Sequence, residues 1–135
     1  MKNRGKGFTL VEVMIALAVV AILVTVAHAS YQEHLRKGRR AAAQSFLVDV
    51  ANRQQQYLMD ARVYAVGATG LATLNMTVPA DVSRFYTVTV QPAANATPPR
   101  FTIVATPVAG TQQVADGALT ITDTGARARN GVAGW

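Results

Sequence analysis

The chain opens with a run of membrane length in which almost every side chain is apolar. The run covers residues 8–29, and its polar exceptions are Thr9, Glu12, Thr25 and His28. A helix of about 22 residues is roughly 33 Å long, and the hydrocarbon core of a bilayer is about 30 Å thick. This pattern predicts a membrane-spanning helix over residues 8–29.

A second apolar pattern follows without a break, over residues 30–62. Apolar residues recur there at spacings of four and seven, which is typical of an amphipathic helix with one buried face. This stripe consists of Leu35, Ala42, Phe46, Leu47, Val50, Tyr57, Leu58 and Ala61. The side chains expected away from it are Glu33, Lys37, Arg40, Gln44, Gln55 and Gln56. Gly38 is the weak position, because glycine in a helix interior is less favourable than alanine by about 1 kcal/mol. We predict one continuous helix from residue 8 to about residue 62.

Beyond residue 62 the pattern indicates a small head, residues 63–135. Residues 63–82 contain Gly67, Gly70 and Pro79 and predict an ordered loop with a helical turn. Three segments of period two follow, at 86–91, 100–106 and 119–122. Their core-facing residues are predicted to be Tyr86, Val88, Val90, Phe101, Ile103, Ala105, Leu119 and Ile121. The expected fold class is α+β, with an antiparallel sheet of three to four strands covered by the amphipathic half of the helix.

Glu12 is the feature that a plain membrane anchor leaves unexplained. An ionised Glu in hydrocarbon costs about 2.5–3.5 kcal/mol on insertion scales, so this carboxylate needs a partner. A secretory signal peptide would use the basic residues Lys2, Arg4 and Lys6 and a cleavage site at residues 27–29, but its apolar core would be shorter. A single-pass anchor accounts for the length of the run and not for Glu12.

The segment Gly7-Phe8-Thr9-Leu10-Val11-Glu12 resembles the start of a type IV prepilin. In that family a short basic leader ends in Gly, Phe usually follows, and Glu is the fifth residue after the cut. The resemblance implies that residues 1–7 are a leader whose basic residues are Lys2, Arg4 and Lys6. It also implies that a membrane aspartyl peptidase cuts between Gly7 and Phe8 and methylates the new Phe8 amine. Glu12 would then pair with the Phe8 amine of a neighbouring subunit in a filament.

The C-terminal end is similar to the minor-pilin branch of that family. Those proteins often end in Cys-Trp, with an upstream Cys that closes a surface loop. This chain ends in Gly134-Trp135 and contains no cysteine, so we expect packing and hydrogen bonds to hold the loop, with Trp135 as a buried anchor. Many pilins also have Pro near the outer end of the membrane half, where this chain has Ala29.

The resemblance implies a structural subunit, a minor pilin, of a type IV pilus. It would cross the bacterial inner membrane once with its head in the periplasm, and later join an extracellular filament. Lys and Arg flank both ends of the apolar run, so the resemblance and not the charge count decides this orientation. Expected partners are other pilin subunits, the prepilin peptidase, the inner-membrane pilus assembly platform and membrane lipid.

Two alternatives stay open at this point. A type II secretion pseudopilin would share the entire N-terminal chemistry. A single-pass membrane protein that binds a partner and never polymerises is the second alternative.

Charge does not favour a nucleic-acid partner. The formal net charge of +6 includes the three basic side chains of the predicted leader. The basic cluster at residues 36–40 is expected near lipid headgroups, against acidic residues of neighbouring pilins, or on a solvated helix face. Arg100, Arg127 and Arg129 form another candidate patch, but without interleaved aromatic residues we do not expect nucleic acid among the partners.

Candidate chemistry is sparse, so we expect no enzyme, no cofactor and no metal site. The sequence shows no Ser/His/Asp set, phosphate-binding glycine loop or carboxylate cluster. His28 and His34 are six residues apart and fall on different faces of a helix. Asp116 and Asp123 lie in predicted turns, where such residues are more often caps than calcium ligands.

Overall fold

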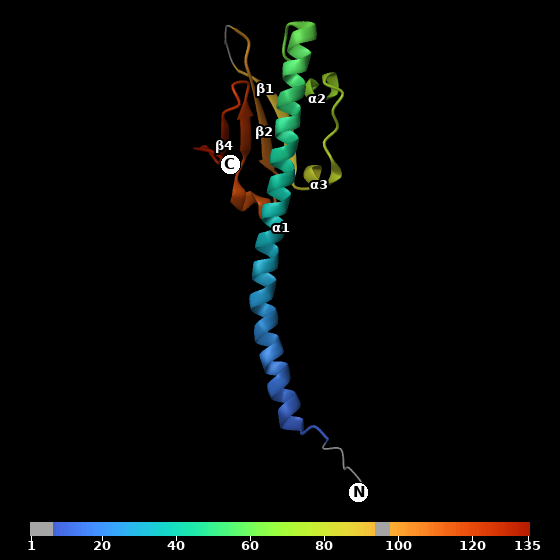
Figure 1. Cartoon of the computed structure of the whole chain (residues 1–135), viewed down its shortest axis with the longest axis vertical. Coiled ribbons are helices and arrows are strands. Elements are labelled where there is room, and N and C mark those ends of the chain that lie inside the picture. Colours follow the sequence, from blue (N-terminus) through green and yellow to red (C-terminus); the bar gives the residue numbers. More distant parts are fainter. Residues whose placement is uncertain (1–6, 94–97) are drawn as a thin grey trace. The chain divides into compact units, whose positions relative to one another are not determined.

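The computed structural model describes residues 7–93 and 98–135. These residues divide into two compact units, with the boundary between Leu35 and Arg36. The predicted leader residues Lys2, Arg4 and Lys6 lie outside the described residues. The long helix α1, Leu10–Ala61, confirms the predicted continuous helix with slightly different ends (Figure 1). It begins after Thr9, whose Oγ1 accepts a hydrogen bond from the Glu12 N–H at 3.2 Å. Thr9 thus acts as the N-cap with Glu12 at position N3, so the helix begins at Leu10 and not at Phe8 as predicted.

The first unit presents apolar side chains to its surroundings. The side chains described between residues 7 and 28 are all exposed, and the large apolar ones include Phe8, Ile15 and Leu23. Within the described residues, α1 is the one helix long and apolar enough to cross a membrane, by length and composition. Such exposure is compatible with lipid as the surrounding medium.

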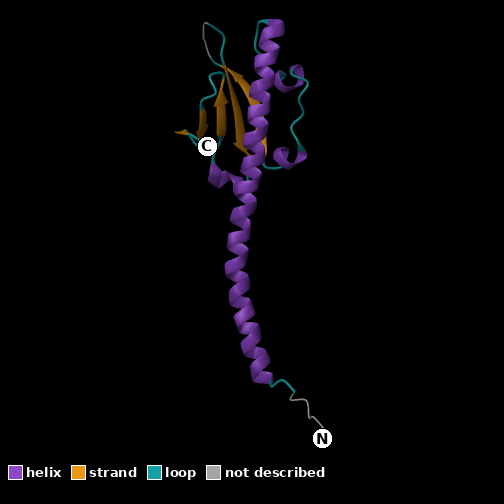
Figure 2. Ribbon diagram, viewed as in Figure 1, coloured by secondary structure: helices purple, strands orange, loops and turns teal. Residues whose placement is uncertain are grey.

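The head contains a five-stranded antiparallel meander with the order β1-β2-β3-β4-β5 (Figure 2). Its strands are β1 Tyr86–Pro92, β2 Phe101–Pro107, β3 Leu119–Thr122, β4 Arg127–Arg129 and β5 Val132–Ala133. The prediction of three to four strands was therefore too low. Both missed strands are at most three residues long, and β4 reads Arg-Ala-Arg, so neither shows an apolar alternation.

The register of the sheet confirms the predicted buried face. Val88 pairs with Ala105, and Ile103 pairs with Ile121, so apolar residues of neighbouring strands share one side. All eight predicted core-facing strand residues are buried. The amphipathic half of α1 contributes Ala43, Phe46, Leu47 and Val50 to the same core.

Short helices complete the head. They are α2 Gly70–Thr73, α3 Ala80–Ser83 and the 3₁₀ helix η1 Gln112–Asp116. The loop at residues 63–82 thus holds two short helices instead of one helical turn. In Figure 1, α2 and α3 appear on the opposite flank of α1 from β4. Leu74 and Val82, from this loop and α3, are buried in the core.

The buried face of α1 differs from the predicted stripe at several positions. Ala61 is exposed because it is the last residue of α1. Arg40 and Gln44, expected away from the core, are half-buried. Both residues line a pocket together with Arg129, Gly134 and Trp135, so the buried face of α1 is wider than its apolar stripe.

Candidate functional site

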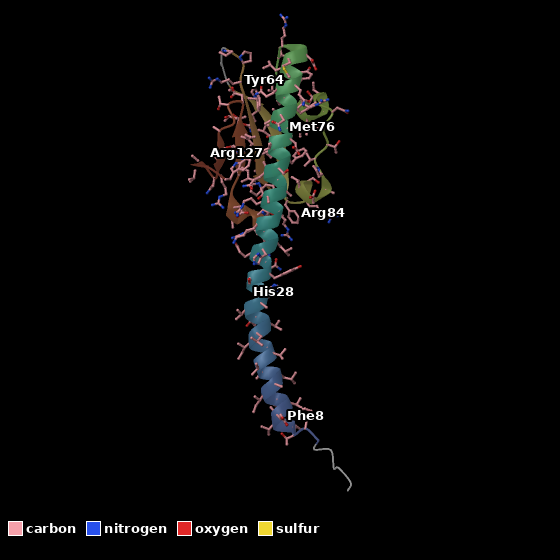
Figure 3. All side chains as sticks on the ribbon, in the orientation of Figure 1. Phe8, His28, Tyr64, Met76, Arg84 and Arg127 are labelled. Carbon is pink, nitrogen blue, oxygen red and sulfur yellow. The ribbon has the colours of Figure 1, made fainter. Side chains whose placement is uncertain are left out.

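The N-terminal segment places Gly7 and Phe8 before the first turn of α1, as Figure 3 shows for the labelled Phe8. Phe8 is 82% exposed, and a side chain at Gly7 would meet nothing within 4 Å. The Gly7–Phe8 peptide bond is therefore outside the helix and unobstructed by the described residues. A peptide bond in such a segment is accessible to a peptidase.

Glu12 lies in the first turn of α1, and its side chain is exposed. A carboxylate there interacts favourably with the positive end of the helix dipole, by about 0.3–1 kcal/mol. It is the only acidic residue between residues 8 and 29. An amine at Phe8 of a second chain would be a suitable partner for this charge.

The two histidines do not form a metal site with other described residues. His28 Nε2 lies 3.5 Å from Gln32 Nε2, and both His28 and His34 are exposed. Within residues 7–93 and 98–135, no group of three His, Cys, Asp or Glu side chains is arranged to hold a metal ion.

The basic cluster at residues 36–40, here called the attachment turn, contacts the head of its own chain. Arg40 Nη1 donates a hydrogen bond of 2.9 Å to Asp116 Oδ1, and Arg36 Nε lies 3.6 Å from the same oxygen. The Arg39 guanidinium lies 4.1 Å from the centre of the Phe85 ring. These three arginines are therefore half-buried against the head and do not form a purely solvated face, while contacts of the cluster with lipid or with other subunits stay predictions.

Asp116 is a buried ion-pair partner and not the turn cap that its sequence context predicted. Its side chain is 3% exposed, and Gln113 Nε2 lies 3.2 Å from its Oδ2. The same Gln113 nitrogen lies 2.9 Å from Tyr86 Oη and 3.3 Å from the backbone oxygen of Arg36. Its two hydrogens are thus shared among three acceptors on α1, β1 and η1.

Burial raises the pKa of the Tyr86 phenol, while the hydrogen bond from Gln113 acts in the opposite direction. Desolvation disfavours the charged phenolate, and the nearby Asp116 carboxylate adds to that effect. Tyr86 therefore stays protonated within this network at neutral pH.

The C-terminal residue Trp135 packs against the edge of the core and contacts strands β3 and β4. Trp135 is half-buried instead of fully buried, and its Nε1 donates a hydrogen bond of 3.1 Å to the Thr120 oxygen. The Arg127 guanidinium lies 4.8 Å from the centre of the Trp135 ring. Next to it is a pocket of about 330 Å³ lined by Arg40, Gln44, Arg129, Gly134 and Trp135.

The predicted patch of Arg100, Arg127 and Arg129 draws on two segments of the head. Arg127 and Arg129 share one face of β4, because they alternate with Ala128 along the strand. Arg100 precedes β2, and its Nε lies 4.0 Å from Asp123 Oδ2. No aromatic residue lies between Arg127 and Arg129 in the sequence, but the fold brings the ring of Trp135 against Arg127.

Sequence reasoning missed the contacts between Asp116 and the attachment turn. Arg36 and Arg40 are one helical turn apart, so they lie on one face, and this spacing was the available signal. Their partner is 76 residues away from Arg40, and nothing in the local pattern connects the two. The contact between Arg127 and Trp135 was missed because β4 and β5 were not recognised as strands.

Comparisons with known proteins agree with this arrangement. Residues 29–120 match a family model described as type IV minor pilin ComP, DNA uptake sequence receptor. Residues 2–27 match the prokaryotic N-terminal methylation motif. The chain is also 30% identical over 84 residues to the type IV wide pilus major component PilA4 of Thermus thermophilus. That match covers 62% of this chain and 63% of the relative, so it spans less than two thirds of the relative's length.

The two family matches cover the apolar half of α1 and most of the head. The methylation motif includes the Gly7, Phe8 and Glu12 constellation. The head match includes the sheet from β1 to the start of β3. The chain therefore belongs to the family of type IV minor pilins, which are structural subunits of pili.

Proposed function

We propose that this protein is a minor pilin that is cut between Gly7 and Phe8, methylated on the Phe8 amine and built into a type IV pilus. The observation that carries the proposal is the position of Phe8 and Glu12 at the start of an exposed apolar helix. The new amine of one subunit and the Glu12 carboxylate of the next would neutralise one another in an apolar surrounding. Such a pair would specify the register between neighbouring subunits, because any other register would leave both charges buried without a partner.

The same proposal gives the location and partners. Before assembly, residues 8–29 span the inner membrane once, with the head in the periplasm, and after assembly the subunit belongs to an extracellular pilus. Its partners are other pilin subunits, the prepilin peptidase, the pilus assembly platform of the inner membrane and membrane lipid. The match to a minor-pilin model over residues 29–120 favours a pilus over a type II secretion pseudopilus.

Intact-mass spectrometry of the protein from its native membrane, or from sheared filaments, tests the maturation. We expect a chain that begins at Phe8 and is heavier by one methyl group. A chain that begins at Ser30 would instead indicate a cleaved signal peptide and would overturn the proposal. A Gly7→Leu variant should keep its leader, because a bulky side chain would then stand next to the bond that is cut.

Assembly is tested by Glu12→Gln, which keeps the size of the side chain and removes its charge. We expect loss of surface filaments with normal amounts of protein in the membrane. Asp49→Asn is the matched control, since Asp49 is an exposed carboxylate on the head portion of α1. Normal filaments in the Glu12→Gln strain would favour the non-polymerising binding protein.

Contact with DNA is a second candidate function. The matched family is described as a DNA uptake sequence receptor. In this chain, Arg127 and Arg129 are exposed, and the ring of Trp135 lies against Arg127. A guanidinium beside an aromatic ring is a combination that can contact phosphate and stack on a base.

Gel-shift titration of the full chain in detergent tests this second function. We expect Arg127→Ala, Arg129→Ala to weaken DNA binding at least about tenfold and to reduce its salt dependence. The control is Arg62→Ala, Arg84→Ala, which removes the same charge from two other exposed arginines. Equal binding by the first double variant and the unaltered protein would exclude this surface.

A further inference from the structure

The attachment turn surrounds the one glycine inside α1. Gly38 follows Arg36 by two residues and directly precedes Arg39 and Arg40, and each of these three arginines contacts the head. Arg36 and Arg40 converge on a single oxygen, Asp116 Oδ1. The side chain of Gln113 also reaches the backbone oxygen of Arg36. Residues 36–40 of α1 therefore make several contacts with the head within about one helical turn.

Packing gives no reason for a glycine at position 38. A side chain added there would meet nothing within 4 Å, and the residue is exposed. Its backbone is helical, so no left-handed conformation requires glycine either. Glycine in a helix interior costs about 1 kcal/mol relative to alanine. The intrinsically weakest residue of α1 is thus placed between its two ion-paired arginines.

We propose that Asp116 is a staple that keeps α1 helical across Gly38, and that Gly38 is a built-in yielding point. When the contacts between Asp116 and the two arginines are broken, the turn at residues 36–40 opens locally while the rest of the head stays folded. Local opening of this kind occurs where few apolar contacts hold a segment in place.

The distribution of burial explains why the opening stays local. The buried residues that α1 contributes to the core begin at Ala43 and continue through Val50, beyond the attachment turn. Arg36 and Arg40 have side chains that are 29% and 19% exposed, so both can turn toward solvent when Asp116 is neutralised. Neither movement opens a cavity among the residues that join α1 to the sheet.

Hydrogen–deuterium exchange of the full chain in detergent micelles, followed by mass spectrometry, tests the proposal. Asp116→Asn keeps the shape of the side chain and removes its charge. We expect exchange of the amides at residues 38–42 to accelerate at least about tenfold. Exchange in residues 46–56 and in strands β1 and β2 should change less than about twofold. Asp123→Asn removes a carboxylate elsewhere in the head and should leave residues 38–42 unchanged.

The yielding point is tested by combining two substitutions. Gly38→Ala added to Asp116→Asn should slow exchange at residues 38–42 again, by about fivefold, because alanine favours the helix. Ser45→Ala is the matched control, an exposed helical position outside the attachment turn. Failure of Gly38→Ala to slow exchange would show that α1 does not open at Gly38.

A uniform acceleration over α1, β1 and β2 in Asp116→Asn would overturn the staple, because Asp116 would then support the head as a whole. Arg36→Gln is the milder variant if Asp116→Asn does not fold, since it leaves Arg40 bound to Asp116. The same local acceleration, smaller in size, is expected from Arg36→Gln. Exchange in Arg36→Gln that matches the unaltered protein at residues 38–42 would also contradict the proposal.

Discussion

Two buried amide side chains, Gln54 and Gln113, join separate segments of the head. Gln54 is fully buried, and it both donates to the Ala65 oxygen and accepts from the Ala65 N–H at 3.0 Å. Ala65 belongs to the segment that follows α1, where the chain reverses direction. The amide of Gln54 thus satisfies two backbone groups that have left the helix and have no sheet partner.

Replacing Gln54 by Leu should destabilise the head by about 2–4 kcal/mol, because both polar groups of Ala65 would stay buried without a partner. Thermal unfolding followed by circular dichroism measures this effect. Gln56→Leu, at an exposed position one half-turn later, should change stability by less than about 0.5 kcal/mol. Equal losses for the two variants would mean that the Gln54 bonds contribute nothing specific.

The pKa of Tyr86 predicts a loss of stability at high pH. Since burial raises this pKa in the folded state, the folded protein holds the proton more tightly than the unfolded chain. The stability that Tyr86 adds through this shift is fully present below the ordinary tyrosine pKa of about 10, and it is lost as pH rises through the folded-state pKa.

Melting temperatures between about pH 8 and pH 11 should therefore fall more steeply for the unaltered protein than for Tyr86→Phe. Tyr57→Phe serves as the control for removing a half-buried phenol at the edge of the core. Parallel curves for the unaltered protein and Tyr86→Phe would contradict the predicted linkage.

Local patterns predicted the residues that follow a repeating period and missed the polar ones. Tyr86, Val88 and Val90 were recognised as one buried face because alternation is a property of the strand itself. Gln54 and Asp116 were not recognised, because their burial depends on partners brought close only by the fold. A polar residue at such a position looks the same in sequence as one on a solvated face.

At the scale of elements, the shortest strands depend on their connections. The backbone at Gly117 has φ 71° and ψ −177°, a conformation that is essentially restricted to glycine. A side chain there would also place its Cβ 2.6 Å from the Cβ of Asn130, which lies in the turn between β4 and β5. The Asn130 N–H in turn donates to the Ala118 oxygen at 2.8 Å.

Gly117→Ala should therefore cost about 3 kcal/mol or more, from backbone strain together with displacement of Asn130. Gly110→Ala is the matched control, because Gly110 has φ 80° but open space around it, and should cost about 1–2 kcal/mol. Chemical unfolding of both variants measures the difference. A loss at Gly117 no larger than at Gly110 would show that Asn130 moves aside freely.

The elements that could be predicted are those with a long repeat. Helix α1 and strands β1 to β3 follow from apolar spacing, and the start of α1 follows from the capping pair of Thr9 and Glu12 once it is recognised. Strands β4 and β5 form because their backbones pair with neighbouring strands. Their side chains show no repeating apolar spacing from which the strands could be predicted. The candidate N-terminal site was recognised because its residues are adjacent in sequence.

For the whole head, one core joins the second half of α1 to the sheet. Leu47 is fully buried in that core, and Leu47→Ala should destabilise the head by about 3–5 kcal/mol through lost contacts and a cavity. Amide exchange should accelerate together in α1 beyond residue 42 and in strands β1 to β3. Val114→Ala, at a residue 54% exposed, should have little effect. Acceleration confined to α1 would mean that helix and sheet are separate cooperative units.

The strand order of the head has a consequence for how the chain folds. Each strand pairs with the strand that precedes it in sequence, so the meander can grow from β1 to β5 by closing short loops in turn. The link between Arg40 and Asp116 instead closes a loop across 76 residues, and it joins a helix made first to a segment made near the end. Loop-closure entropy therefore favours a folding sequence in which the sheet forms early and docks onto α1 late. During synthesis, the apolar stripe of α1 therefore stays exposed until the strands that cover it have left the ribosome.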